Sequence, residues 1–156
     1  MAKELKNMKK NRILLVEDDE LDVISVKRSL NKLDVDYELF TAYNGIEALE
    51  ILNGTDTKPR LTTLPDVVLL DLNMPKMNGI EFLTAVRTDE RLKSMKVFVM
   101  TTSGEEADRR TAESLGISGY LIKPLNFNNN SKRTDSMDGF VQFHMRKIFA
   151  TSEPPL

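Results

Sequence analysis

The sequence predicts an α/β fold in which a doubly wound, five-stranded parallel sheet is covered by helices on both faces. Five short runs rich in Val, Ile, Leu and Phe have the length and composition of buried strands. Segments with apolar residues at helical spacing separate these runs, and one more follows the last run. Because right-handed crossovers between parallel strands place helices on both faces of a sheet, this alternation favours the doubly wound arrangement.

The predicted strands follow one another as RILLV, YELFTA, DVVLL, VFVM and GYLI, at residues 12–16, 37–42, 66–70, 97–100 and 119–122. The predicted helices cover residues 20–33, 45–53, 79–88, 105–115 and 136–149. Helical spacing is clearest in the first helix, whose apolar residues fall on overlapping faces: Leu21, Ile24, Val26, Leu30 and Leu33. Two segments, 53–65 and 126–136, are rich in turn formers and longer than the usual loops of about 2 to 6 residues. We expect both to be elaborated surface loops.

Length and composition limit the classes of function. A chain of 156 residues suits one domain with a real core, which we expect over residues 11–150, with a flexible N-terminus at 1–10 and a disordered tail at 151–156. The net charge of −2 gives no sign of a nucleic-acid or membrane-surface partner. The chain has no cysteine and a single histidine, His144, which excludes thiolate chemistry and disfavours a metal cluster built on histidines. Without a signal peptide or an apolar run of about 20 residues, we expect a cytoplasmic protein.

Polar side chains follow four of the predicted strands at the point where each strand ends. Glu17 and Asp18 follow the first strand, Asp71 the third, Thr101 the fourth and Lys123 the fifth. Open α/β sheets bind ligands at this edge, next to a topological switch point. If the first and third strands are neighbours, three carboxylates share one crevice and cannot all stay ionised without a cation, for which Mg²⁺ is well suited. The lysine and the threonine are suited to holding phosphoryl oxygens.

Each of these residues also has an ordinary structural explanation. Asp18 or Asp19 can cap the first helix, and Asp71 can belong to a turn. Lys123 can be a solvated lysine, and Thr101 a β-branched strand residue. Their conjunction at the ends of four of the five predicted strands favours a site that binds a metal and an anion.

The motifs ILLVED, LLDLNMPKMNG, VMTTS and GYLIKP, in this order, resemble the receiver domain of two-component response regulators over residues 12–149. The resemblance implies a flavodoxin-like receiver fold with strand order 2-1-3-4-5 and a Mg²⁺ cofactor. It implies phosphorylation of Asp71, and a metal site formed by the Asp18 and Asp71 side chains and the Asn73 backbone carbonyl, with Glu17 holding a bound water. Further roles implied are phosphoryl contacts by Thr101 and Lys123, a switch formed by Thr101 and Tyr120, and loop shaping by Pro75, Gly79 and Pro124. Gly79 is expected to use the freedom of glycine at positive φ, and the Lys123–Pro124 bond to be cis.

A receiver of this kind takes a phosphoryl group from a histidine kinase or a phosphotransfer protein and catalyses only its own phosphorylation and dephosphorylation. His144 is therefore not the donor. We expect the phosphoryl group to draw in Thr101, and Tyr120 then to move from an exposed to a buried position. This would change a face made of the helix at 105–115, the strand at 119–122 and the helix at 136–149, through which a downstream protein target or a second copy of the chain would bind.

Only 33 residues follow Lys123, so we expect no output domain and a stand-alone receiver. A weaker similarity, in the loop at 53–65 and in FVQFHMRKIF, links the chain to receivers that serve phytochrome-type and hybrid histidine kinases.

Three other functions compete with this interpretation. An aspartyl-phosphate phosphatase of the haloacid dehalogenase type needs a second Asp two residues after the first, where this chain has Asn73. A flavodoxin-like FMN carrier needs a phosphate loop after the first strand, where this chain has acidic residues, and no Gly-rich nucleotide motif is present. A pseudo-receiver that binds partners without phosphorylation is the other alternative, and normal signalling by an Asp71→Asn variant would support it.

Overall fold

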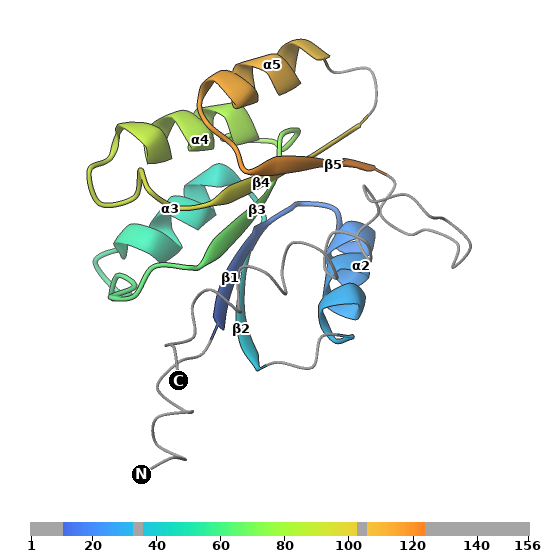
Figure 1. The fold of residues 1–156 in the computed structure, drawn as a ribbon. Helices are drawn as coiled ribbons and strands as arrows, with labels where there is room; N and C mark the ends of the chain where they lie inside the picture. Colours follow the sequence, from blue (N-terminus) through green and yellow to red (C-terminus); the bar gives the residue numbers. More distant parts are fainter. Residues whose placement is uncertain (1–10, 33–35, 103–105, 124–156) are drawn as a thin grey trace, which may run out of the picture.

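The computed structural model describes residues 11–32, 36–102 and 106–123, which form nine elements of an alternating α/β fold (Figure 1). In chain order these are β1 (Asn11–Val16), α2 (Glu20–Leu30), β2 (Tyr37–Ala42), α3 (Gly45–Asn53), β3 (Val67–Asp71), α4 (Gly79–Thr88), β4 (Val97–Thr102), α5 (Glu106–Ser114) and β5 (Gly119–Lys123). The strands form one sheet in the order β2-β1-β3-β4-β5, and all four neighbouring pairs are parallel. The predicted fold class and strand order are confirmed. The predicted helix at 136–149 and the predicted loop at 126–136 lie outside the described residues, and the domain limits stay a prediction.

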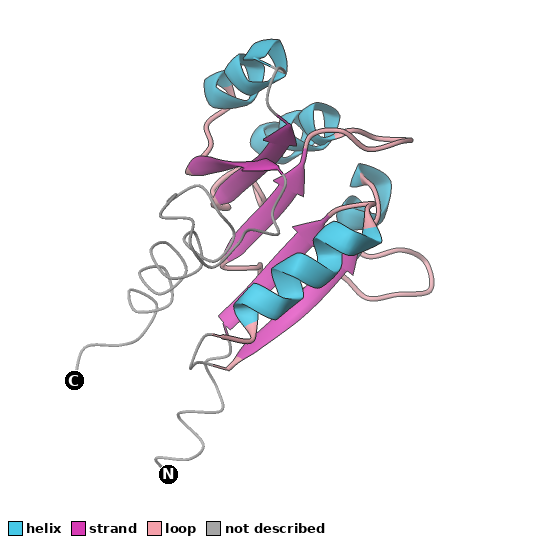
Figure 2. Cartoon of the chain, turned by 90° about the vertical axis from the view of Figure 1, so that its right-hand side faces the viewer, coloured by secondary structure: helices cyan, strands magenta, loops and turns pink. Residues whose placement is uncertain are grey.

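The sheet is buried on both faces because successive residues of a strand point to opposite sides. Ile13 and Leu15 of β1 belong to one buried cluster, and Leu14 and Val16 belong to the other. The first cluster packs against α2, and the second packs against α3, α4 and α5, so the helices lie on both sides of the sheet (Figures 1 and 2). Burial on both faces explains why the central strands are continuous apolar runs in the sequence.

The buried face of α2 differs from the predicted one. Val23, Val26 and Leu30 are buried, at the spacing of one helical stripe. Leu21 and Ile24, which the helical spacing places on faces overlapping that of Val26 and Leu30, are 75 % and 49 % exposed and do not share the buried face. The stripe at 23, 26 and 30 contacts the sheet, and residues 21 and 24 fall on a neighbouring face of the helix that turns outward.

The connection from β3 to α4 is held close to the end of β3. A Cβ atom on Gly79 would lie 2.4 Å from the Asp71 carbonyl oxygen and 2.6 Å from Leu72 Cα, so only glycine fits there. The expected positive φ at Gly79 is not found; among the described residues of this connection, Lys76 is the one in the left-handed region, at φ 58°. Glycine is therefore required by the close approach of the two backbones and not by its own conformation.

The predicted loop between α3 and β3 is present and is anchored by one arginine. Residues 54–66 contain neither helix nor strand. The Arg91 guanidinium donates to the Leu52 carbonyl at 2.9 Å and also to the Leu61 carbonyl. These two bonds connect the start and the middle of the loop to the residues after α4.

Candidate functional site

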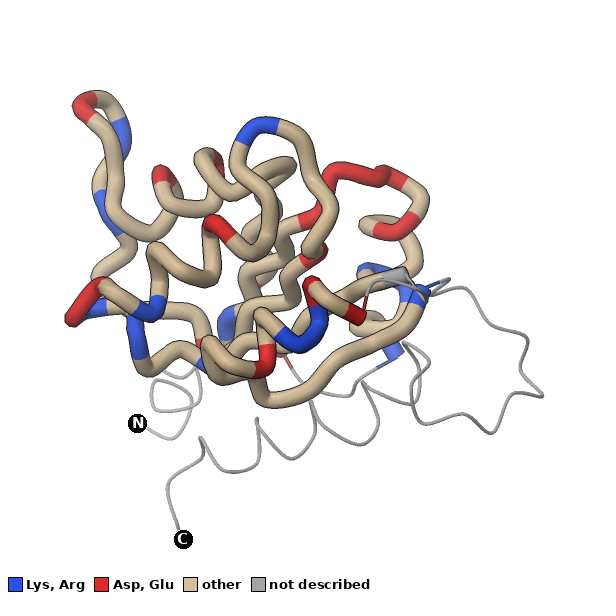
Figure 3. Tube along the Cα trace, turned by 90° about the horizontal axis from the view of Figure 1, so that it is seen from above, with Lys and Arg blue, Asp and Glu red and all other residues tan. Residues whose placement is uncertain are grey.

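The parallel register brings the predicted site residues to one edge of the sheet. Val16 pairs with Leu70, which places Glu17 and Asp71 at the ends of neighbouring strands. Thr102 pairs with Lys123, so the lysine lies at the same edge, two strands away from Asp71. The segment between β1 and α2, from Glu17 to Glu20, is entirely acidic, whereas acidic and basic positions are interspersed elsewhere on the trace (Figure 3).

The Lys123 ammonium lies among three carboxylates. Its Nζ is 2.8 Å from Glu17 Oε1, 2.9 Å from Asp22 Oδ2 and 3.3 Å from Asp71 Oδ2. The Lys123 side chain is only 15 % exposed, so the explanation that it is a solvated lysine is wrong. To reach Glu17 and Asp22, the side chain extends from β5 across the ends of β4 and β3.

Asp22 is the member of this cluster that the sequence did not single out. It lies in the first turn of α2, where an acidic residue is ordinarily explained by the helix dipole. One signal was available, because side chains in a first helical turn point back toward the N-terminus and hence toward the edge of the sheet. That signal is shared by every helix that follows a parallel strand, and it does not identify a partner.

The capping alternatives are resolved by the hydrogen bonds at the start of α2. Asp19 is the N-cap, and its Oδ1 accepts from the Leu21 N–H at 2.8 Å and from the Asp22 N–H at 3.4 Å. Asp18 is exposed and does not cap the helix, which leaves its carboxylate available to a ligand. Asp71 does take part in the turn after β3, because its Oδ1 accepts from the Asn73 N–H at 3.1 Å. Its other oxygen still faces Lys123, so the turn and the site use the same side chain.

Burial and mutual repulsion control the protonation of the site. Burial raises the pKa of Glu17 to about 8, and the hydrogen bond with Asp71 and its charge add to this rise. Burial also raises the pKa of Asp71, although Glu17 and Lys123 oppose the change. Burial alone would lower the pKa of Lys123, but the carboxylates around it raise it above its ordinary value. Without a metal, the pair of buried carboxyls therefore retains a proton near neutral pH.

The residues present fit a divalent cation. Glu17, Asp18 and Asp71 each offer a carboxylate oxygen, and these oxygens lie within 4.8 Å of one another. Glu17 Oε1 is buried and, among the described residues, makes no hydrogen bond of regular geometry, although it lies close to Lys123. Hard oxygen donors and an excess of negative charge are what Mg²⁺ and similar cations require. A cation would also remove the need for a proton on Glu17.

The fourth and fifth strands contribute the other predicted residues. Thr101 is 2 % exposed at the end of β4, and Tyr120 is 39 % exposed on β5. The Arg109 guanidinium of α5 lies over the Tyr120 ring, 4.4 Å from its centroid. Pro124 lies outside the described residues, so the cis peptide and its loop-shaping role stay predictions.

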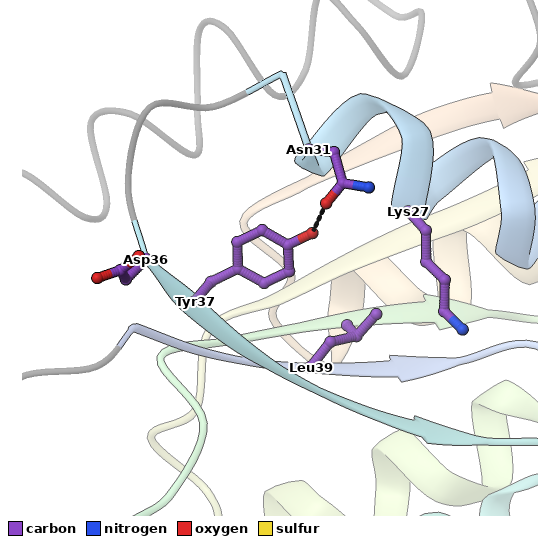
Figure 4. A pocket seen from close by; sticks show the side chains of 5 residues that line it. All are labelled: Lys27, Asn31, Asp36, Tyr37 and Leu39. Atoms are coloured by element: carbon purple, nitrogen blue, oxygen red, sulfur yellow. Dashed lines mark hydrogen bonds between the residues drawn. The ribbon is translucent and has the colours of Figure 1, made fainter.

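A hollow of about 470 Å³ lies at the opposite end of α2 from the carboxylates (Figure 4). Its lining includes Tyr37, whose hydroxyl donates to Asn31 Oδ1 at 2.5 Å. This hollow has Asp36 as its single acidic residue, and it lacks the convergent charges found around Lys123. The carboxylate edge is therefore the candidate site. Within the described part of the chain, no helix has the length and apolar content needed to cross a bilayer.

Comparison with known proteins agrees with this geometry. The sequence matches the response regulator receiver domain family over residues 13–134. The probable methanogenesis regulatory protein FilR2 of Methanothrix harundinacea is 38 % identical, over 78 % of this chain and 77 % of its own. The phosphorylated cyanobacterial phytochrome response regulator RcpA superposes with a TM-score of 0.76 at 30 % identity, covering 89 % of this chain and 96 % of its own. The Mn²⁺-bound form of response regulator Rcp1 does so with a TM-score of 0.70 at 33 % identity, covering 85 % and 93 %. This chain therefore belongs to the response regulator receiver domain family of two-component signalling.

Proposed function

We propose that this protein accepts a phosphoryl group on Asp71 from a phosphohistidine of a partner protein, with Mg²⁺ as the cofactor. The observation that carries the proposal is the position of the Lys123 ammonium, 3.3 Å from Asp71 Oδ2, at a site where oxygens of Glu17, Asp18 and Asp71 lie within 4.8 Å of one another. A cation and an ammonium on either side of one buried carboxylate suit the transfer of an anionic group to that carboxylate.

In the proposed reaction, an Asp71 carboxylate oxygen attacks phosphorus while the bond from phosphorus to the imidazole nitrogen breaks. The Asn73 N–H, which donates to Asp71 Oδ1 at 3.1 Å, fixes the orientation of the attacking group. Lys123 donates to an oxygen of the transferred group. Glu17, Asp18 and Asp71, together with the Asn73 carbonyl, would hold Mg²⁺, which supplies charge neutralisation on that group when bound.

Receiver domains interact with histidine kinases and with downstream targets, and they are generally not enzymes in the classical sense. Exposed apolar side chains near the site support a protein donor for this chain. Leu21 and Ile24 on α2 are 75 % and 49 % exposed, and Tyr43 and Ile46, after β2, are 46 % and 45 % exposed. Apolar residues grouped around a charged crevice are typical of a protein-binding surface. The docking partner we propose is a histidine kinase or a phosphotransfer protein.

For the output, we propose a switch that connects Thr101 to Tyr120. An aspartyl phosphate adds charge and acceptor oxygens beside the end of β4, which would attract the Thr101 hydroxyl. Movement of Thr101 would open space for the half-exposed Tyr120 ring, and the face formed by α5 and β5 would change for a downstream protein or a second copy of the chain. The contact between Arg109 and the Tyr120 ring supports an outward position of Tyr120 before phosphorylation.

The test is the intact mass of the protein after incubation with acetyl phosphate and Mg²⁺, compared with EDTA. We expect a gain of one phosphoryl group in the wild type and in Asp36→Asn, a matched change of an exposed aspartate far from the site. We expect no gain in Asp71→Asn or in EDTA. Absence of labelling in the wild type, together with no binding of beryllofluoride, would reject the proposal in favour of a pseudo-receiver.

A further inference from the structure

We propose that Asp22 is a positioning residue, which holds the Lys123 ammonium in front of Asp71 once a divalent cation has engaged Glu17 and Asp71. This inference rests on the proposed function, because the benefit of holding Lys123 there is phosphoryl transfer to Asp71. The observation behind it is the ion pair of 2.9 Å between Lys123 Nζ and Asp22 Oδ2, between side chains that are 15 % and 18 % exposed.

Asp22 differs from the other two ion-pair partners of Lys123 because it is not among the residues that would bind the metal. The oxygens that lie within 4.8 Å of one another and could share a cation come from Glu17, Asp18 and Asp71, and Asp22 is not among them. A bound cation would therefore neutralise Glu17 and Asp71 while leaving the charge of Asp22 for Lys123.

A bound cation would also weaken the other two contacts that hold the Lys123 ammonium in place. A divalent ion held by Glu17 and Asp71 would repel the ammonium that contacts both of them at 2.8 and 3.3 Å. A lysine side chain is flexible and can turn toward water when its counter-charges are lost. Asp22 supplies the remaining negative charge, and it lies on α2, which carries none of the three residues that would share the cation.

The number of hydrogen-bond donors on the Lys123 ammonium is compatible with this role of Asp22. A lysine ammonium has three donors and no acceptor. If one donor stays on Asp22, two others remain free to turn toward the oxygens of a group on Asp71. Asp22 would thus orient Lys123 without touching the transferred group, which distinguishes it from Lys123 itself.

The N-cap of α2 does not require the Asp22 side chain. Asp19 already accepts the N–H groups of Leu21 and Asp22, so the Asp22 side chain is not required for the cap. Glu20 lies in the same turn, carries the same charge and is exposed. Glu20→Gln is therefore a matched control for the loss of one negative charge from this helix turn.

The first experiment observes the Lys123 ammonium by NMR in the full chain with saturating Mg²⁺, without any phosphoryl donor. We expect one slowly exchanging lysine Nζ signal, assigned by its loss in Lys123→Gln. In Asp22→Asn the hydrogen exchange at this signal should be at least about tenfold faster, and Glu20→Gln should leave it unchanged. An unchanged signal in Asp22→Asn would overturn the proposal, whatever the phosphorylation rate does.

The second experiment measures the rate of phosphorylation by acetyl phosphate in a double-mutant cycle. We expect Asp22→Asn to slow the reaction on the order of tenfold, which corresponds to the strength of a charge-assisted hydrogen bond. In the Lys123→Gln background the same change should have less than about a twofold effect. An equal loss in both backgrounds would show that Asp22 acts by another route and would overturn the inference.

Two further observations distinguish a failure of this inference from a failure of the proposed function. Asp22→Glu should restore both the protected signal and most of the rate, because it retains the charge; if Asp22→Asn does not fold, the Asp22→Ala variant replaces it. If the wild type is not phosphorylated under any condition, the proposed function fails, while the NMR experiment still decides whether Asp22 anchors Lys123.

Discussion

Glu17→Gln should stabilise the metal-free protein, and the gain should increase with pH. Glu17 is 1 % exposed, and burial together with Asp71 raises its pKa from 4.5 to about 8. Between these values the folded protein carries a proton on Glu17 that the unfolded chain has released. The folded state therefore binds more protons in this window, and its stability falls as the pH rises from 4.5 to about 8.

The size of the effect follows from the distance between the two pKa values. At pH 7 the cost of keeping the proton on Glu17, whose pKa when unperturbed is 4.5, is about 3 kcal/mol at roughly 1.4 kcal/mol per pH unit. Glutamine needs no proton and avoids this cost. The figure is an upper bound, because the substitution also removes a charged partner of Lys123 at 2.8 Å. At pH 5 the expected gain is below about 1 kcal/mol.

The assay is urea unfolding at pH 5, 6, 7 and 8 in EDTA, followed by far-UV circular dichroism because the chain has no tryptophan. The difference in unfolding free energy between Glu17→Gln and wild type should rise with pH. Glu20→Gln, an exposed neighbour, should stay within about 0.5 kcal/mol of wild type throughout. Saturating Mg²⁺ should stabilise the wild type more than Glu17→Gln. A difference that does not change between pH 5 and 8 would refute the reasoning.

Three other substitutions test how the site is supported. Gly79→Ala places a Cβ 2.4 Å from the Asp71 carbonyl oxygen and should cost about 1–3 kcal/mol of unfolding free energy, measured in urea. Arg109→Gln removes a cation–π contact worth about 0.5–1 kcal/mol, so the buried position of Tyr120 should become a few times more populated, as read from ¹⁹F NMR of a fluorotyrosine. Arg91→Met removes the guanidinium hydrogen bonds to the end of α3 and to Leu61 in the loop before β3, and it should accelerate amide hydrogen exchange in that loop on the order of tenfold, with no change in Mg²⁺ affinity.

Each of these predictions has a matched control. Gly116 has φ +87°, and a Cβ added there would make only an ordinary contact, with Arg87 Nε at 3.8 Å, so Gly116→Ala carries the cost of conformation without a clash. Arg110 pairs with the exposed Glu106, and Arg110→Gln should leave the Tyr120 signal unchanged. Lys93 pairs with Glu90 at the surface, and Lys93→Met should leave exchange in the loop unchanged. Equal effects in a test variant and its control would contradict the corresponding prediction.

The strands and the site edge could be predicted because each depends on local pattern. A run such as DVVLL is continuous because both faces of the sheet are buried, and parallel strands necessarily bring their carboxyl ends to one edge. The boundaries shifted slightly, since the predicted strand at 66–70 is Val67–Asp71 in the structure. Asp71 is thus the last residue of the strand, which explains why it is only 2 % exposed.

Other features depend on distances that a linear pattern does not contain. Leu21 and Ile24 have helical spacing with other apolar residues, but which stripe is buried depends on how α2 is oriented on the sheet. The role of Gly79 depends on the approach of two backbones, and glycine at such a position is indistinguishable in sequence from glycine at positive φ. Asp22 is paired with a lysine 101 positions later, and its ordinary explanation as a first-turn acid conceals this.

The charges at the site explain why the proposed function requires both Lys123 and a metal. Without a cation, the buried Glu17 and Asp71 are held together by a proton and by the ammonium that contacts each of them. A cation makes the proton unnecessary and weakens the hold of these two carboxylates on the lysine. In the proposed function, Asp22 would then keep the ammonium at the site, and Asp71 would meet an incoming anion between the metal and the ammonium. In the proposed function the metal would bind before the phosphoryl group, because a divalent cation offsets most of the excess negative charge that the four carboxylates of the site carry over Lys123.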